Sequence, residues 1–139
     1  MARILVVDDE EDIVQVVSIT LEARGHEVQA AYNGKECLAM VKKEEPDLII
    51  LDVMMPKMNG MQVVDTLRNS TQYNHIPIIM LTAATQYSRK PDDYWKNKVG
   101  VEDYISKPFE PVELLNRVDK VLKENYREKG DGLGRFKIK

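Results

Sequence analysis

Three carboxylates in this chain each follow directly on a short apolar run. Asp8 and Asp9 follow the first run, and Asp52 follows a later one. Carboxylates that are packed together repel one another and resist ionisation unless a cation neutralises them. A set of oxygen ligands of this kind suits Mg²⁺, which takes one or two carboxylates, keeps several waters and fills its other positions with phosphate oxygens. These residue types therefore predict a magnesium site used for phosphate chemistry.

Two further polar residues also follow apolar runs. Thr82 comes after the run 78–81, and Lys107 comes shortly after Tyr104-Ile105. Carboxylate, metal, hydroxyl and ammonium are together the groups needed to take up a phosphoryl group. In this interpretation Asp52 attacks as the nucleophile, Lys107 and the metal balance charge, and Thr82 donates a hydrogen bond. The sequence around Asp52, taken alone, is explained equally well if Asp52 merely ends a strand or starts a turn.

The apolar runs have the lengths and compositions of buried strands. Leu48–Leu51 is too short for a helix and has no polar alternation, so it fits a strand buried on both faces of a parallel sheet. The predicted strands are Arg3–Val7, Glu27–Ala31, Leu48–Leu51, 78–81 and 104–105. Helical spacing between and after them predicts helices that begin near residues 11, 34, 60, 88 and 111, the last of them running to Glu124.

This alternation predicts an α/β fold, a five-stranded doubly wound parallel sheet in a flavodoxin-like three-layer sandwich. Five strands suit the order 2-1-3-4-5, whose switch point lies between strands 1 and 3. Asp8 and Asp9 end the first strand and Asp52 ends the third. All three carboxylates are therefore expected at the crevice where such sheets bind ligands.

Composition narrows the functional classes. The 139 residues suffice for one domain, and the single cysteine, Cys37, fits a reducing cytoplasm. No apolar run near the start of the chain is long enough for an export signal or a membrane span, so we expect a cytoplasmic protein without membrane contact. The net charge is −3, but residues 126–139 carry +3, so the rest of the chain carries −6. This acidic remainder argues against nucleic-acid binding by the domain itself. We expect 126–139 to be a flexible basic tail or linker stub.

Over residues 2–125 the sequence resembles the receiver domains of two-component response regulators. The resemblance rests on Asp8-Asp9, Asp52 with Pro56 and Gly60, Thr82-Ala83, Tyr104, and Lys107-Pro108-Phe109, in the order of that family. We therefore predict a receiver domain over residues 1–125.

The resemblance implies a mechanism. Asp52 would be phosphorylated by the phosphohistidine of a sensor histidine kinase or phosphotransfer protein. Asp8 and Asp9 would hold Mg²⁺ together with Asp52 and the backbone carbonyl of Met54, and Lys107 would contact the phosphoryl group. The chain would catalyse only its own phosphorylation and dephosphorylation and would not otherwise be an enzyme.

The resemblance also implies a switch. Thr82 would turn toward the phosphoryl group and Tyr104 would move inward behind it, although an ordinary half-buried strand aromatic explains Tyr104 equally well. The predicted helix at 88–99, the strand at 104–105 and the last helix would then present a surface to an output protein that the sequence does not name, or to a second copy of the chain.

Two features depart from the common pattern of the family. The 25-residue span from Thr82 to Lys107 is a few residues longer than usual. Met54 and Ala84 are apolar at positions that tune phosphoryl lifetime, so neither can orient an attacking water. We expect autodephosphorylation that is not fast.

Several alternatives stay open at different weights. A phosphohydrolase of the haloacid dehalogenase type would have Asp-x-Asp at its nucleophile, whereas here Met54 stands two residues after Asp52. A flavodoxin-like electron carrier shares the fold class, but five consecutive acids after the first strand would repel a flavin phosphate. Fourteen residues after Asn125 are too few for a helix-turn-helix, so we expect either action through protein contacts or a receiver cut from a longer regulator. A pseudo-receiver that binds partners without phosphorylation is the remaining alternative.

Overall fold

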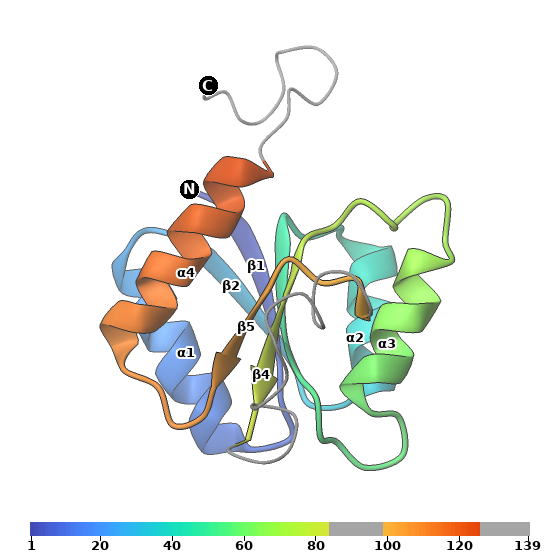
Figure 1. Cartoon of the computed structure of the whole chain (residues 1–139), viewed down its shortest axis with the longest axis horizontal. Helices are drawn as coiled ribbons and strands as arrows, with labels where there is room; N and C mark the ends of the chain where they lie inside the picture. Colours follow the sequence, from blue (N-terminus) through green and yellow to red (C-terminus); the bar gives the residue numbers. More distant parts are fainter. Residues whose placement is uncertain (84–98, 126–139) are drawn as a thin grey trace.

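The computed structural model describes residues 1–83 and 99–125. Within these residues, five parallel strands form one sheet in the order β2-β1-β3-β4-β5, flanked by helices on both faces (Figure 1). The elements are β1 (Arg3–Val7), α1 (Glu11–Ala23), β2 (Glu27–Ala31), α2 (Gly34–Lys43), β3 (Leu48–Asp52), α3 (Gly60–Arg68), β4 (Ile78–Thr82), β5 (Asp103–Ser106) and α4 (Pro111–Glu124). The predicted α/β architecture and strand order are confirmed.

Two sequence predictions fall outside the described residues. They are the helix at 88–99, apart from its last residue, and the tail at 126–139. No helix within 1–83 and 99–125 is both long enough and apolar enough to span a membrane.

The sheet separates two apolar cores. Helices α1 and α4 cover one face and α2 and α3 cover the other (Figure 1). Side chains alternate along each strand, so Ile4 packs toward α1 and α4 whereas its neighbour Leu5 packs toward α2 and α3. Burial on both faces explains why β3 and β4 are buried throughout, as the unbroken apolar runs predict.

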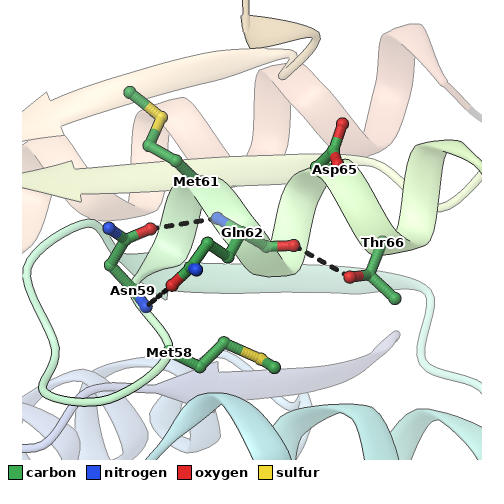
Figure 2. Close-up of a pocket in the computed structure, with 6 residues that line it drawn as sticks. All are labelled: Met58, Asn59, Met61, Gln62, Asp65 and Thr66. Atoms are coloured by element: carbon green, nitrogen blue, oxygen red, sulfur yellow. Dashed lines mark hydrogen bonds between the residues drawn. The ribbon is translucent and has the colours of Figure 1, made fainter.

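The start of α3 is defined by a capping box. The Asn59 side chain accepts the Gln62 backbone N–H at 3.0 Å, and the Gln62 side chain accepts the Asn59 N–H at 2.9 Å. Figure 2 shows this pair in a surface pocket that Met58 and Met61 also line. Asn59 and Gln62 of this pocket thus serve to begin the helix.

Gly60 allows α3 to begin directly against β3. A Cβ at this position would collide with the backbone oxygen of Asp52, and the Gly60 N–H donates to the Val53 carbonyl at 2.8 Å. Only glycine lets the two backbones approach this closely. The turn after β3 therefore helps to set the position of Asp52.

Candidate functional site

The predicted site residues lie at the carboxyl edge of four neighbouring strands. Asp8 and Asp9 follow β1, Asp52 ends β3, Thr82 ends β4 and Lys107 follows β5. In the parallel register, Val7 pairs with Leu51, Asp52 with Leu81 and Thr82 with Ser106, so the strand ends are level with one another. Groups that are up to 99 positions apart in the sequence are therefore gathered at one edge.

The three carboxylates converge as expected. One oxygen from each of Asp8, Asp9 and Asp52 lies within 4.8 Å of the other two. Asp8 and Asp52 are buried, whereas Asp9 is exposed. The two buried acids and the exposed third acid together offer hard oxygen ligands at an edge that solvent can reach. Such a ligand set fits Mg²⁺.

Lys107 joins the two buried acids. Its Nζ lies 2.8 Å from Asp8 Oδ2 and 3.2 Å from Asp52 Oδ1. Its peptide bond to Pro108 is cis. The single ammonium of Lys107 balances only one of the three clustered carboxylates, Asp8, Asp9 and Asp52. The cluster therefore keeps an excess of negative charge that a divalent cation can neutralise.

Burial and like charge shift the titration of this cluster. Burial, reinforced by the neighbouring Asp8 charge and opposed by Lys107, raises the pKa of Asp52 to about 6. Burial also raises the pKa of Asp8, although its hydrogen bond to Lys107 opposes the shift. For Lys107, burial lowers the pKa, but the hydrogen bond to Asp8 and the charge of Asp52 outweigh burial and raise it.

Thr82 and Tyr104 lie on adjacent strands and on the same face of the sheet. Thr82 shares its face with Met80, which pairs with Tyr104 across β4 and β5. Thr82 Oγ1 is buried and has no hydrogen-bond partner among residues 1–83 and 99–125, and Tyr104 is half-buried. A buried hydroxyl without a partner is costly, so Thr82 has a donor available for a ligand at the edge.

Met54 lies in the loop after β3 with its side chain 56% exposed. The role predicted for its backbone carbonyl stays a prediction. Ala84, the other apolar residue from which we predict that autodephosphorylation is not fast, lies outside the described residues.

Glu10 is a member of the site that sequence reasoning missed. From the sequence alone, the acids Glu10, Glu11 and Asp12 are explained by their favourable interaction with the dipole at the start of a helix. In the structure Glu10 Oε1 also lies 3.3 Å from Lys107 Nζ. The position of Glu10 directly after Asp8-Asp9 is the sequence feature that could have indicated a place in the site. Its contact with Lys107, 97 positions away, cannot be predicted from local sequence.

The sheet order and the acidic cluster at its carboxyl edge define the class of this molecule as a flavodoxin-fold domain with a candidate ligand site at its switch point. The family model for the response regulator receiver domain matches residues 4–119. The chain belongs to the response regulator receiver domain family.

Curated relatives agree with this assignment. The chain is 40% identical over 127 residues to the DNA-binding dual master transcriptional regulator RpaA of Synechocystis, covering 91% of this chain and 52% of RpaA. It is 42% identical over 123 residues to the alkaline phosphatase synthesis transcriptional regulatory protein PhoP of Bacillus subtilis, covering 88% of this chain and 49% of PhoP. The chain therefore spans about half the length of these relatives.

Solved structures show the same fold. The chemotaxis protein CheY4 of Vibrio cholerae is 40% identical with a TM-score of 0.77, covering 87% of this chain and 98% of CheY4. The receiver domain of Francisella response regulator 1452 is 32% identical with a TM-score of 0.79, covering 91% of this chain and all of that domain.

Proposed function

We propose that this receiver domain is a phosphoacceptor switch that takes a phosphoryl group on Asp52 from the phosphohistidine of a sensor histidine kinase or phosphotransfer protein. An Asp52 carboxylate oxygen attacks phosphorus, the P–N bond to the imidazole breaks, and the imidazole leaves with the electron pair. The chain catalyses only its own phosphorylation and dephosphorylation.

The chain's own groups have separate tasks in this reaction. Lys107 balances charge on the transferred phosphoryl oxygens, and the Thr82 hydroxyl donates a hydrogen bond to them. Asp8 and Asp9, with Asp52 and the Met54 carbonyl, would hold Mg²⁺. When bound, Mg²⁺ would neutralise the carboxylates and the developing charge on the phosphoryl group.

The observation that carries the proposal is the position of Lys107 between two buried carboxylates. Its Nζ lies within 3.2 Å of both Asp8 and Asp52, beside an exposed third acid, Asp9. A structural ion pair needs one acid for one base, whereas this cluster holds excess carboxylate on a ligand-binding edge. This excess suits a site that takes up a divalent cation and a phosphoryl group together.

The switch would reach its output through Thr82 and Tyr104. Thr82 and Tyr104 share a face of β4 and β5, so movement of the hydroxyl toward a phosphoryl group can open space for the ring. This would change the surface at β5 and α4, which would bind an output protein or a second copy of the chain in the cytoplasm. Because the relatives are named as transcriptional regulators of about twice the matched length, the same switch within a longer regulator is a second candidate context.

The test is intact-mass analysis after incubation with acetyl phosphate and Mg²⁺. We expect a single phosphoryl adduct on the wild type that is absent from Asp52→Asn and absent when a chelator removes the metal. An unlabelled wild type would contradict the proposal and favour a pseudo-receiver that binds its partners without phosphorylation.

A further inference from the structure

Glu10 occupies the N-cap position of α1 but does not cap it. Its side chain accepts no hydrogen bond from the first turn of the helix. Instead Glu10 Oε1 lies 3.3 Å from the Nζ atom of Lys107, a residue 97 positions away in the sequence. The side chain is therefore directed to the site and not to the helix that it precedes.

The backbone of Glu10 is anchored to the same cluster. Its N–H donates to Asp8 Oδ1 at 2.9 Å, which holds Glu10 beside the buried acid. The Glu10 side chain is 62% exposed, compared with 15% for Lys107 and 0% for Asp8. The Lys107 ammonium is thus shared between two buried carboxylates on its inner side and one solvent-facing carboxylate on its outer side.

This arrangement affects any anionic phosphodonor. The donor needs Lys107 for its phosphoryl oxygens, yet it meets the Glu10 charge on the exposed side of that ammonium. We propose that Glu10 is a positioning residue that holds Lys107 at the mouth of the acidic edge, so that a phosphodonor must compete with its carboxylate for the ammonium. This inference rests on the phosphoacceptor function proposed above.

Stability does not explain the contact. Ion pairs with an exposed partner contribute little to the free energy of unfolding. The favourable interaction with the dipole of α1 does not explain it either, because Glu11 and Asp12 in the first turn already supply that charge. Glu11 is exposed and, among the described residues, Lys107 pairs with Asp8, Glu10 and Asp52 but not with Glu11.

Glu11 therefore offers a matched control. The experiment measures the rate of adduct formation with acetyl phosphate and Mg²⁺ on the full chain, for wild type, Glu10→Gln, Glu10→Asp and Glu11→Gln. In this reaction the Asp52 oxygen forms a bond to phosphorus as the P–O bond to the acetyl group breaks and acetate leaves. We expect Glu10→Gln to react about three- to tenfold faster than wild type, which corresponds to about 0.7–1.4 kcal/mol.

The other variants separate contact from charge. Glu11→Gln removes the same charge without touching Lys107, so its rate should stay within about twofold of wild type because solvent and salt screen exposed charges. Glu10→Asp keeps the charge but is one methylene shorter, so it should also be faster than wild type. A second readout is the Lys107 Cε–Hε NMR signal of the unphosphorylated protein, which should move in Glu10→Gln and stay in place in Glu11→Gln.

Each remaining outcome overturns the inference. Equal rates for wild type and Glu10→Gln, or equal acceleration by Glu10→Gln and Glu11→Gln, would remove the role of the contact while wild-type labelling still supports the phosphoacceptor. If no form of the chain is labelled, the phosphoacceptor proposal fails and this inference fails with it.

Discussion

Asp52 is held where its charged form is unfavourable. It is only 4% exposed, and burial together with the Asp8 charge raises its pKa to about 6. In the unfolded chain the carboxyl ionises near its usual pKa of 3.8. Between these two values Asp52 holds a proton in the native state that it has lost in the unfolded state, so the contribution of Asp52 to stability decreases as pH rises from about 4 through 6. An ionised Asp52 thus lowers the free energy of unfolding of the metal-free protein at neutral pH.

Removing this charge should stabilise the metal-free protein. We expect Asp52→Asn to raise the free energy of unfolding by about 1–3 kcal/mol at pH 7.5, and by much less near pH 3.5, where the carboxyl is largely protonated in both states. Urea denaturation at the two pH values measures the difference. Glu22→Gln, an exposed charge removal on α1, should have only a small effect. A gain that is the same at both pH values would refute the electrostatic cause.

At the scale of elements, one arginine ties the last turn of α3 to two other segments. Arg68 donates to the carbonyl oxygens of Gly100 at 2.8 Å, Asn74 at 3.0 Å and Ile76 at 2.8 Å. Its remaining bond, at 3.1 Å, goes to the half-buried carboxylate of Glu102. The planar guanidinium thus joins α3, the connection to β4 and the approach to β5, so it ties together the segments that lead into the strand ending in Thr82 and the strand preceding Lys107.

Loss of this guanidinium should loosen the packing of β4 and β5. We expect Arg68→Met to lower the free energy of unfolding by about 2–4 kcal/mol, because Glu102 loses its ion-pair partner and three carbonyls lose a donor. Arg68→Lys should recover only part of the loss, since an ammonium cannot span these acceptors. In a double-mutant cycle with Glu102→Gln, additive losses would show that the two side chains are not coupled.

At the scale of the whole molecule, the acidic edge should link stability to divalent metal. A ligand that binds only the folded state stabilises it by about 2.7 kcal/mol when its concentration is one hundred times the dissociation constant. The Asp8, Asp9 and Asp52 cluster forms only when β1 and β3 are paired, so the unfolded chain lacks it. Mg²⁺ should therefore raise the melting temperature of this protein.

Substitution of Asp9 tests this link between stability and Mg²⁺. Asp9 is exposed, so Asp9→Asn should fold normally and lose most of the Mg²⁺-dependent rise in melting temperature. Thermal denaturation with MgCl₂, compared with NaCl at equal ionic strength, measures the effect. A rise that NaCl reproduces, or that survives in Asp9→Asn, would indicate general screening of charge in place of a bound ion.

The sequence alone determined the architecture. Uninterrupted apolar runs such as Leu48–Leu51 identify strands buried on both faces, and their alternation with amphipathic segments leaves few topologies for five strands. Because the carboxyl ends of parallel strands lie at one edge of the sheet, the same pattern predicts that Asp8, Asp9, Asp52, Thr82 and Lys107 lie near one another. These predictions rest on local periodicity and chain direction, both of which a sequence displays.

Which side chains touch depends on the packing of the whole fold. The approach of Glu10 to Lys107 and the four bonds of Arg68 join residues that no local pattern relates. Burial likewise depends on the finished packing: Asp8 and Asp9 are adjacent in sequence, yet one is buried and the other exposed. Contacts and desolvation are set by how helices and strands pack in three dimensions, so the electrostatics of the site became visible only once the sheet and its helices were assembled.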